Sequence, residues 1–341
     1  TADSTYRADD NDGAVNPGSF TVFSSPVVTV TDVFSPNTTV TQGQTSIPMT
    51  VTLTNTGDTP VDITGIAIRP GIGSYVEDWD TPYPAGLASG ATEQITGTLE
   101  VRENSATGPD TIHVQIQYRN MLSGGDSTFI GTTYHSWVIE SVSLVEILSV
   151  NAGPERISLG QNDIDVTVKL KNVGGSTVEI DTIMVGFRQF EDNYSNRIIT
   201  PGSQLPNDQQ GTFVLQLDVN EAAVSGPDTM FARIVYTEIN TLDQKSIVDS
   251  IFITDEWVVE ERPLITVDSV SVRPLVVSTG QKGLIGSVYI SNAAAPYRAS
   301  ARINGAEMRM FLGEDGRLDQ FDTTRVETPT LPLVLESGKR T

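Results

Sequence analysis

Apolar and polar residues alternate along most of the chain, which is the pattern of strands with one buried face. In the run 47–57, Met49, Val51 and Leu53 alternate with threonines, and an Asn-Thr-Gly turn follows. No long window has apolar residues at helical spacing. The pattern therefore predicts an all-β protein.

The first part of the chain divides into short strands separated by turns. The expected strands are 27–33, 47–57, 61–68, 91–101, 111–120 and a closing strand near 128–140. The polar, aromatic-bearing stretch 69–86 is expected to be a loop. About seven short strands in roughly 115 residues are typical of an immunoglobulin-like β-sandwich.

The same unit recurs along the sequence. Gly43, Gly160 and Gly280 occupy one position of a shared pattern, and Gly-Pro-Asp-Thr recurs at 108–111 and 226–229. The runs HSWVIE and DEWVVE recur near the ends of the first two copies. Because three blocks repeat at nearly one offset, we expect tandem sandwiches. The predicted domains are an acidic extension at 1–25, repeats at 26–141 and 142–262, and an incomplete repeat at 263–341.

The third repeat breaks off at a definable turn. The sequence Leu-Glu-Ser-Gly ending at Gly338 matches Leu-Ala-Ser-Gly ending at Gly90. Its closing strands lie either in a continuation of a longer protein or in another copy of the chain. The segment SFTVFSS at 19–25 could form one strand. One strand cannot replace the three closing strands that the third repeat lacks.

The joins between repeats are short. Trp137 and Trp257 come just before them, and Pro263 follows the second tryptophan. Because no Gly/Ser spacer is present, we expect a semi-rigid rod. Each tryptophan is expected either to pack in a core or to support the contact between neighbouring repeats.

The runs LTNTGDTPVDI and LKNVGGSTVEI resemble the bacterial cell-adhesion-related Ig-like domains of the CARDB type. That resemblance covers most of residues 27–341 and implies adhesins, surface layers, filaments or accessory regions of secreted hydrolases. The third repeat departs from it, with SNAAAP in the corresponding turn.

Charge and cysteine content narrow the location and the partners. The formal net charge is −22, so nucleic acid and anionic membranes are poor partners. The chain has no cysteine, which excludes disulfides and thiolate metal sites and favours a prokaryotic surface protein over a eukaryotic one. No apolar run approaches the roughly 20 residues needed to span a bilayer.

Catalytic residues are not evident. The only two histidines are His113, expected to face solvent, and His135, and the second repeat has Phe231 and Asp255 in their places. No nucleophile elbow, zinc-protease motif or phosphate loop is present. We therefore expect a protein without catalytic activity or a cofactor.

Calcium is a minority expectation at acidic loops, since carboxylate oxygens are its usual ligands. The stretch 9–13 lacks a complete calcium-loop pattern and is expected to be a solvated tail. The weak candidate ligands are Glu77, Asp78, Asp80, Glu191, Asp192, Glu314 and Asp315.

Two other features suggest a ligand or a modification. Aromatic loops from Tyr75 to Tyr83 and from Phe187 to Tyr194 could bind glycans, although such side chains more often pack on a sheet edge. Asn37 and Asn193 lie in weak glycosylation sequons.

The sequence as a whole predicts a structural or adhesive segment of a secreted or cell-surface prokaryotic protein: a stalk, filament subunit or surface-layer component. Its partners would be itself or other surface proteins and glycans. The alternative is a non-catalytic accessory or glycan-binding region of a large secreted hydrolase.

Overall fold

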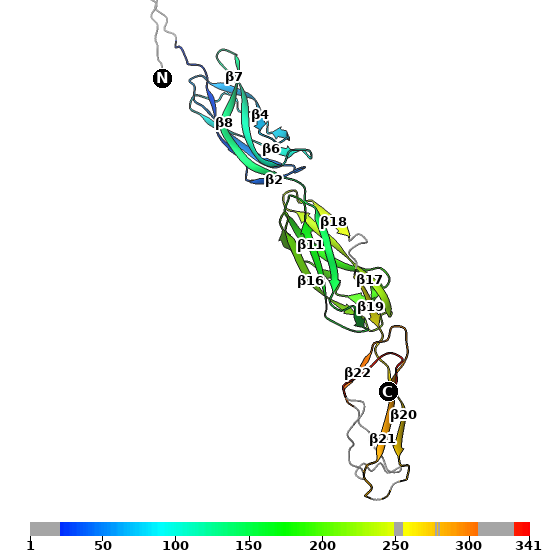
Figure 1. Cartoon of the computed structure of the whole chain (residues 1–341). Helices are drawn as coiled ribbons and strands as arrows, with labels where there is room; N and C mark the ends of the chain where they lie inside the picture. Colours follow the sequence, from blue (N-terminus) through cyan, green and yellow to red (C-terminus); the bar gives the residue numbers. More distant parts are fainter. Residues whose placement is uncertain (1–20, 249–254, 277, 279, 306–330) are drawn as a thin grey trace, which may run out of the picture.

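A computed structural model describes residues 21–248, 255–276, 278, 280–305 and 331–341. Within these residues the protein is all-β, as predicted, apart from one short 3-10 turn at Glu191–Asn193. Figure 1 shows three β units following one another along an elongated molecule, with the N-terminal segment at one end and β20 and β21 at the other. None of the described residues forms a helix long and apolar enough to cross a membrane.

The first unit is a β-sandwich of two four-stranded sheets, with the orders β1-β3-β6-β5 and β2-β8-β7-β4. Its strands are β1 (Val28–Phe34), β2 (Thr39–Thr41), β3 (Ile47–Asn55), β4 (Val61–Pro70), β5 (Tyr75–Trp79), β6 (Thr92–Val101), β7 (Gly108–Asn120) and β8 (Asp126–Glu140).

The predicted alternation forms the core of this unit. In β3, Met49, Val51 and Leu53 are at most 1% exposed, while the threonines between them lie on the outer face. Six strands were expected near their observed places. Two were missed: β2, and β5 inside the stretch predicted to be a loop, where Tyr75–Trp79 pairs antiparallel with β6.

The second unit has a four-stranded sheet, β13-β16-β11-β9, facing a larger one, β10-β19-β17-β12-β14, to which β15 and β18 are added. Its strands are β9 (Val145–Ala152), β10 (Arg156–Ser158), β11 (Ile164–Asn172), β12 (Val178–Phe187), β13 (Tyr194–Ser195), β14 (Ile198–Ile199), β15 (Ser203–Leu205), β16 (Gln210–Val219), β17 (Gly226–Glu238), β18 (Gln244–Val248) and β19 (Asp255–Glu260). Each of the first two units has its own cluster of buried apolar side chains.

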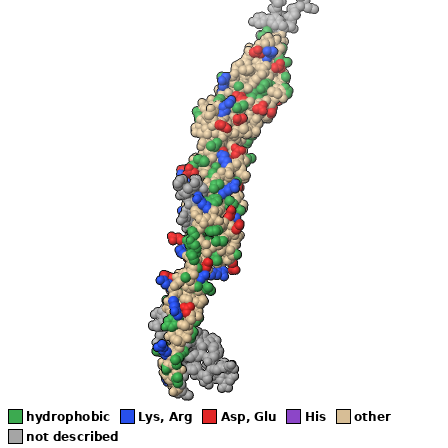
Figure 2. All heavy atoms as spheres, turned by 90° about the vertical axis from the view of Figure 1, so that its right-hand side faces the viewer, with side chains coloured by type: hydrophobic (Ala, Val, Ile, Leu, Met, Phe, Trp, Pro, Cys, Tyr) green, Lys and Arg blue, Asp and Glu red, His purple; other side chains and the backbone are tan. Residues whose placement is uncertain are grey.

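In the described part of the third unit, four strands form two antiparallel pairs. The strand β20 (Ile265–Arg273) pairs with β21 (Ile285–Asn292), and β22 (Ala301–Ile303) pairs with β23 (Leu333–Leu335). Figure 2 shows the molecule turned by 90° and still elongated, with acidic and basic side chains scattered along this face.

Candidate functional site

A buried aspartate, a tyrosine and a tryptophan form one network in the first unit. The Asp110 carboxylate accepts hydrogen bonds from the Tyr75 hydroxyl at 2.6 Å and from the backbone N–H groups of 71–73 and Thr111. The Trp137 indole N–H donates to the Tyr75 hydroxyl at 2.9 Å. Asp110 thereby holds the loop before β5 against the start of β7.

The second unit repeats this Asp–Tyr–Trp network from a different loop. Asp228 accepts from the Tyr194 hydroxyl at 3.2 Å and from three backbone N–H groups, those of Gln189, Phe190 and Thr229. Trp257 donates its indole N–H to Tyr194 at 3.1 Å. The two aspartates belong to the repeated Gly-Pro-Asp-Thr block, so the repeat encodes the network's acceptor.

The network is suited to holding loops and not to proton transfer. Burial, and the neighbouring aspartates, raise the pKa of Tyr75 and Tyr194 well above the usual range, so both hydroxyls stay protonated. Burial alone would raise the pKa of Asp110, but the hydrogen bonds from Tyr75 and the loop lower it.

The structure distinguishes between the two expectations for the tryptophans that precede the joins. Trp137 and Trp257 are 3% and 1% exposed and belong to the core clusters of their own units. Their indole N–H groups are bonded within those units, so each tryptophan packs in a core, the first of the two expectations. The sequence alone does not distinguish core packing from a role at the join, because both need a large aromatic side chain.

A buried asparagine marks the same corner in all three units. Asn55 donates through Nδ2 to the carbonyls of Thr59 and Leu87. Asn172 donates to Ser176 and Leu205 in the same way, and Asn292 to Ala299 and Leu335. The third unit therefore keeps this corner although its turn sequence departs from the other two.

The first join is a direct contact between units. The Thr41 hydroxyl of β2 donates to the Ser176 hydroxyl of the second unit at 3.1 Å, and both residues are fully buried. The Asn240 amide of the second unit donates to Thr41 at 2.9 Å and to the Glu140 carboxylate at 3.2 Å. These four side chains, Thr41, Glu140, Ser176 and Asn240, are called the first junction below.

The linker itself lies against a glycine turn of the second unit. The Val173 N–H donates to the Leu144 carbonyl at 2.7 Å, and the Gly175 N–H donates to the Val142 carbonyl at 3.3 Å. A Cβ atom on Gly174 would lie 2.2 Å from the Leu144 nitrogen, so only glycine allows this close approach. The linker 141–144 therefore packs along its length against the second unit.

A buried charge anchors the linker. The Glu238 carboxylate accepts from the Ser143 N–H at 2.9 Å, from the Ser143 hydroxyl at 2.5 Å and from Lys245 at 2.8 Å. Burial alone would raise the pKa of Glu238, but these partners lower it and keep the carboxylate charged. Burial, with the nearby charge of Glu238, raises the pKa of Glu140.

The second join uses backbone pairing. The Glu261 N–H donates to the Tyr297 carbonyl at 2.6 Å, and the Ala299 N–H donates back to Glu261 at 2.9 Å. The Glu261 carboxylate also pairs with Arg298 at 2.7 Å. Pro263, predicted at this join, lies just after these contacts and is exposed.

The acidic candidates do not converge on a cation site in the described part of the chain, where no group of three or more metal-binding side chains occurs. Glu77 accepts from the Ile68 N–H and the Trp79 indole, and Asp80 from the Thr96 hydroxyl, while Asp78 is exposed. Glu191 pairs with Arg197 at 2.6 Å, and Asp192 accepts from Asn220 through its backbone carbonyl. The stretch 9–13, Glu314 and Asp315 lie outside the described residues.

The two sequons differ in burial. Asn37 is partly exposed. Asn193 is 5% exposed, and its side-chain amide exchanges two hydrogen bonds with the Val224 backbone, at 2.9 and 3.0 Å. The folded structure therefore disfavours a glycan at Asn193, because the nitrogen that would carry it is buried and bonded.

The two histidines, His113 and His135, are both only partly exposed. His113 was expected to face solvent, but its ring contacts the Tyr134 ring and its Nδ1 is buried. His135 bonds the Asn37 carbonyl at 3.0 Å and meets the edge of Trp137. Neither has a carboxylate or nucleophile as its hydrogen-bond partner among the described residues.

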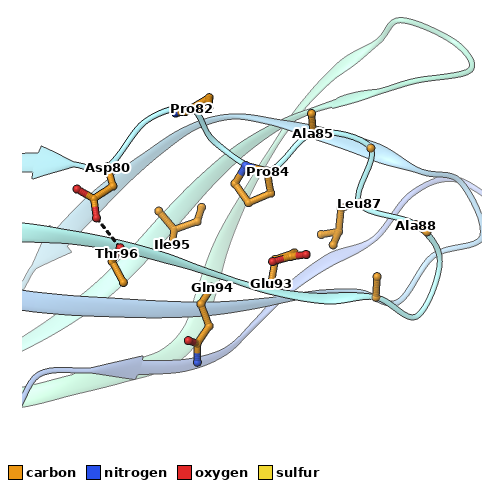
Figure 3. Close-up of a pocket in the computed structure, with 12 residues that line it drawn as sticks. Asp80, Pro82, Pro84, Ala85, Leu87, Ala88, Glu93, Gln94, Ile95 and Thr96 are labelled. Carbon is orange, nitrogen blue, oxygen red and sulfur yellow. Dashed lines mark hydrogen bonds between the residues drawn. The ribbon is translucent and has the colours of Figure 1, made fainter.

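A shallow cleft runs beside β6 in the first unit. Figure 3 shows Pro82, Pro84 and Leu87 along one wall, and Glu93 and Gln94 on β6. Asp80, at one end, is bonded to Thr96 (Figure 3). The nearby aromatics Trp79 and Tyr83 pack against the core, so the predicted glycan-binding loop has its rings turned inward in this unit.

No family model matches the chain, and no curated protein matches it. Similar solved structures include a protein of unknown function from Porphyromonas gingivalis W83, with 11% identity and a TM-score of 0.25 over 69% of this chain and 98% of that one. The secreted serine protease VesC from Vibrio cholerae has 9% identity and a TM-score of 0.22, over 57% and 48% of the two chains. A YadV chaperone has 11% identity and a TM-score of 0.19, over 64% and 98%. At these scores the likenesses carry no argument about function.

Proposed function

We propose that the chain is a non-catalytic structural segment of a secreted or cell-surface prokaryotic protein, a semi-rigid stalk or filament element. Its units would be tandem immunoglobulin-like sandwiches of the CARDB type, with boundaries near residues 26, 142 and 263. The observation that carries the proposal is the first junction, where two buried hydroxyls and an amide join neighbouring units directly.

The physical argument concerns bending. A flexible linker would let the units move independently, whereas buried hydrogen bonds that lose their partners on bending each cost about 1–3 kcal/mol. The linker 141–144 is additionally bonded to the turn at Val173–Gly175. Rigidity at a join is useful for holding something at a distance.

Small-angle scattering tests the proposal on the full chain. We expect an extended particle whose maximum dimension changes little with salt. The double variant Thr41→Val, Asn240→Ala should bend at the first junction and shorten the average particle, without a change in the strand content seen by circular dichroism. The matched control is Gln216→Ala, an exposed side chain of β16 that lies opposite Asp165, towards the end of the second unit remote from the junction. A compact wild-type particle, or a double variant identical to wild type, would reject the stiff-rod function.

A further inference from the structure

The cleft beside β6 lies where one sheet of the first unit has an unpaired edge. The strand β5 pairs with β6 only as far as Trp79, opposite Gly97. The Asp80 N–H adds one hydrogen bond to the Thr96 carbonyl at 2.9 Å, and the chain then leaves this sheet. Among the described residues, which include every strand of the first unit, nothing pairs with 92–95 on this side. The first part of β6 therefore has a free edge.

The main-chain groups at this edge are available for pairing. The Thr96 carbonyl points to the side of β5, because it accepts from Asp80 there. Since main-chain groups alternate in direction along a strand, the N–H and C=O groups of Gln94 and Thr92 point to the same side. The strand β3 occupies only the opposite edge of β6 along this stretch. An edge of this kind is a template for an added strand.

The other wall of the cleft is a loop that is bonded to the opposite sheet. The Pro84 carbonyl accepts from the Ile63 N–H at 3.0 Å, and Leu87 exchanges two hydrogen bonds with Val61, at 2.7 and 3.1 Å. This loop is therefore held by β4 and leaves a gap between itself and β6. Figure 3 shows Glu93 on the β6 side of the gap, facing Pro84 and Leu87.

The second unit fills the corresponding space with a ring of its own. Gly211 of β16 holds the strand position of Glu93, as the register of each strand with its neighbour shows. A Cβ atom on Gly211 would lie 2.7 Å from the Phe213 ring and 3.5 Å from the Leu205 side chain. Leu205 is the counterpart of Leu87, because a buried asparagine bonds the carbonyl of each. The two units therefore differ in that the first leaves open a space that the second closes.

Charge and lining favour a basic peptide as the occupant. The ionisable side chains that line the cleft are those of Asp80 and Glu93, and both are acidic. Residues 21–140 carry twelve acidic and three basic side chains, so a cationic segment is attracted to this unit. A second copy of the chain, with a net charge of −22, is repelled. No aromatic side chain lines the cleft, so it lacks a flat ring on which a sugar would stack.

We propose that the cleft beside β6 binds an extended, lysine- or arginine-bearing segment of a partner protein as an added strand. Because side chains of paired strands lie on the same face, the partner residue opposite Glu93 points into the cleft. A lysine or arginine there lays its methylene stem along Pro84 and Leu87 and brings its charge to the Glu93 carboxylate. The site gives the proposed structural segment a partner, and it does not depend on stiff joins between units.

Fluorescence anisotropy of a labelled peptide in which threonine and lysine alternate tests the proposal on the full chain. We expect saturable binding that weakens as salt rises. Glu93→Gln should weaken it about fivefold, because the charge that faces the lysine is lost. The matched control is Glu100→Gln on the same strand, where Val76 of β5 already occupies the edge, and it should bind as wild type does. Equally tight binding of a peptide with glutamate in place of lysine would refute the charge preference and the proposal with it.

Filling the cleft tests the site without relying on charge alone. The double variant Glu93→Gly, Ile95→Phe gives the first unit the two residues that the second unit has at these positions. The added ring should close the cleft and abolish peptide binding. Circular dichroism should show unchanged strand content, because the second unit already accommodates this pair. Binding to the filled variant as tight as to wild type, or no saturable binding to wild type, would overturn the proposal.

Two further peptides test strand pairing itself. One is N-methylated at every threonine nitrogen and the other at every lysine nitrogen, so they block opposite edges of the extended peptide, because successive N–H groups point in opposite directions. Only one of the two should lose binding, and which one it is reports the direction of the added strand. Equal affinity of both peptides for the wild-type chain would exclude an added strand.

Discussion

The first and second units build the same Asp–Tyr–Trp network from different loops. In the first, the loop passes through Gly71 and Gly73, where added Cβ atoms would lie 2.9 and 2.5 Å from the Asp110 carboxylate. In the second, Gln189 and Phe190 donate to Asp228 without a glycine, and the short 3-10 turn follows. The comparison teaches that the repeat preserves the aspartate and the tryptophan, while the loop that carries the tyrosine can change.

Removing the acceptor should have the largest effect. We expect Asp110→Ala and Asp228→Ala each to destabilise its own unit by about 3 kcal/mol, because several buried donors lose their partner. Asp110 accepts from five groups and Asp228 from four, so the first unit should lose at least as much. Calorimetry that resolves the two unfolding transitions measures this. Equal shifts of both transitions in either variant would contradict separate networks.

The loop difference gives a second test. Gly73→Ala should cost the first unit about 2 kcal/mol, since a Cβ atom there would lie 2.4 Å from the Tyr75 ring. Gln189→Ala, at an exposed position in the second unit's loop, should cost at most about 0.5 kcal/mol. Urea unfolding of both variants provides the comparison. If the two costs were equal, the glycine loop would not be the tighter one.

Acid should weaken both units through different carboxylates. The pKa values of Asp110 in the first unit and Glu238 in the second are lowered in the folded protein. The stabilisation that these carboxylates provide is therefore complete above their unfolded pKa values, near 4, and is lost as the pH falls through the folded values. Melting temperatures followed from pH 6 to pH 2 should fall for both transitions. Glu238→Gln should flatten the acid dependence of the second transition and leave that of the first unchanged.

The Glu140 carboxylate at the first junction should have the smallest effect on stability, and the pH dependence of that effect should be opposite in sign to that of Asp110 and Glu238. Burial raises the folded pKa of Glu140, so its charge costs stability at neutral pH, and that cost disappears as the pH falls through the folded and then the unfolded pKa. Glu140→Gln should therefore raise stability at pH 7 by a few tenths of a kcal/mol at most. A loss of stability at pH 7 in this variant would show that the Asn240 hydrogen bond requires the charged form.

Much of the strand layout could be predicted from the sequence, because alternation reports which face is buried. The six expected strands of the first unit lie near their predicted places. The strand β5 was missed because 69–86 is polar and rich in turn residues, and its pairing with β6 depends on long-range contact. The prediction placed Trp137 and Trp257 next to the joins, but a linear pattern does not reveal whether an indole points outwards or inwards.

The residues that form the first junction were not predicted at all. Thr41, Ser176 and Asn240 are ordinary turn or strand-end residues in a chain rich in threonine and serine. Their contact arises only when two units are placed end to end. The recurring glycines Gly57 and Gly174 were the one sequence signal for this region. A Cβ atom on either would lie 2.4 or 2.2 Å from the backbone nitrogen of Val27 or Leu144, in the chain that enters the unit.

The short parallel pairing of β2 with β8 has a mechanical consequence. Thr39–Thr41 pairs with Val138–Glu140 near the exit of the first unit, and Arg156–Ser158 pairs with Val258–Glu260 in the second. A pull on the two ends of the molecule draws each pair of strands along its own length, in shear. The hydrogen bonds of each pair then carry the load together and do not open one after another. These two three-residue pairings would therefore set the force at which each unit unfolds.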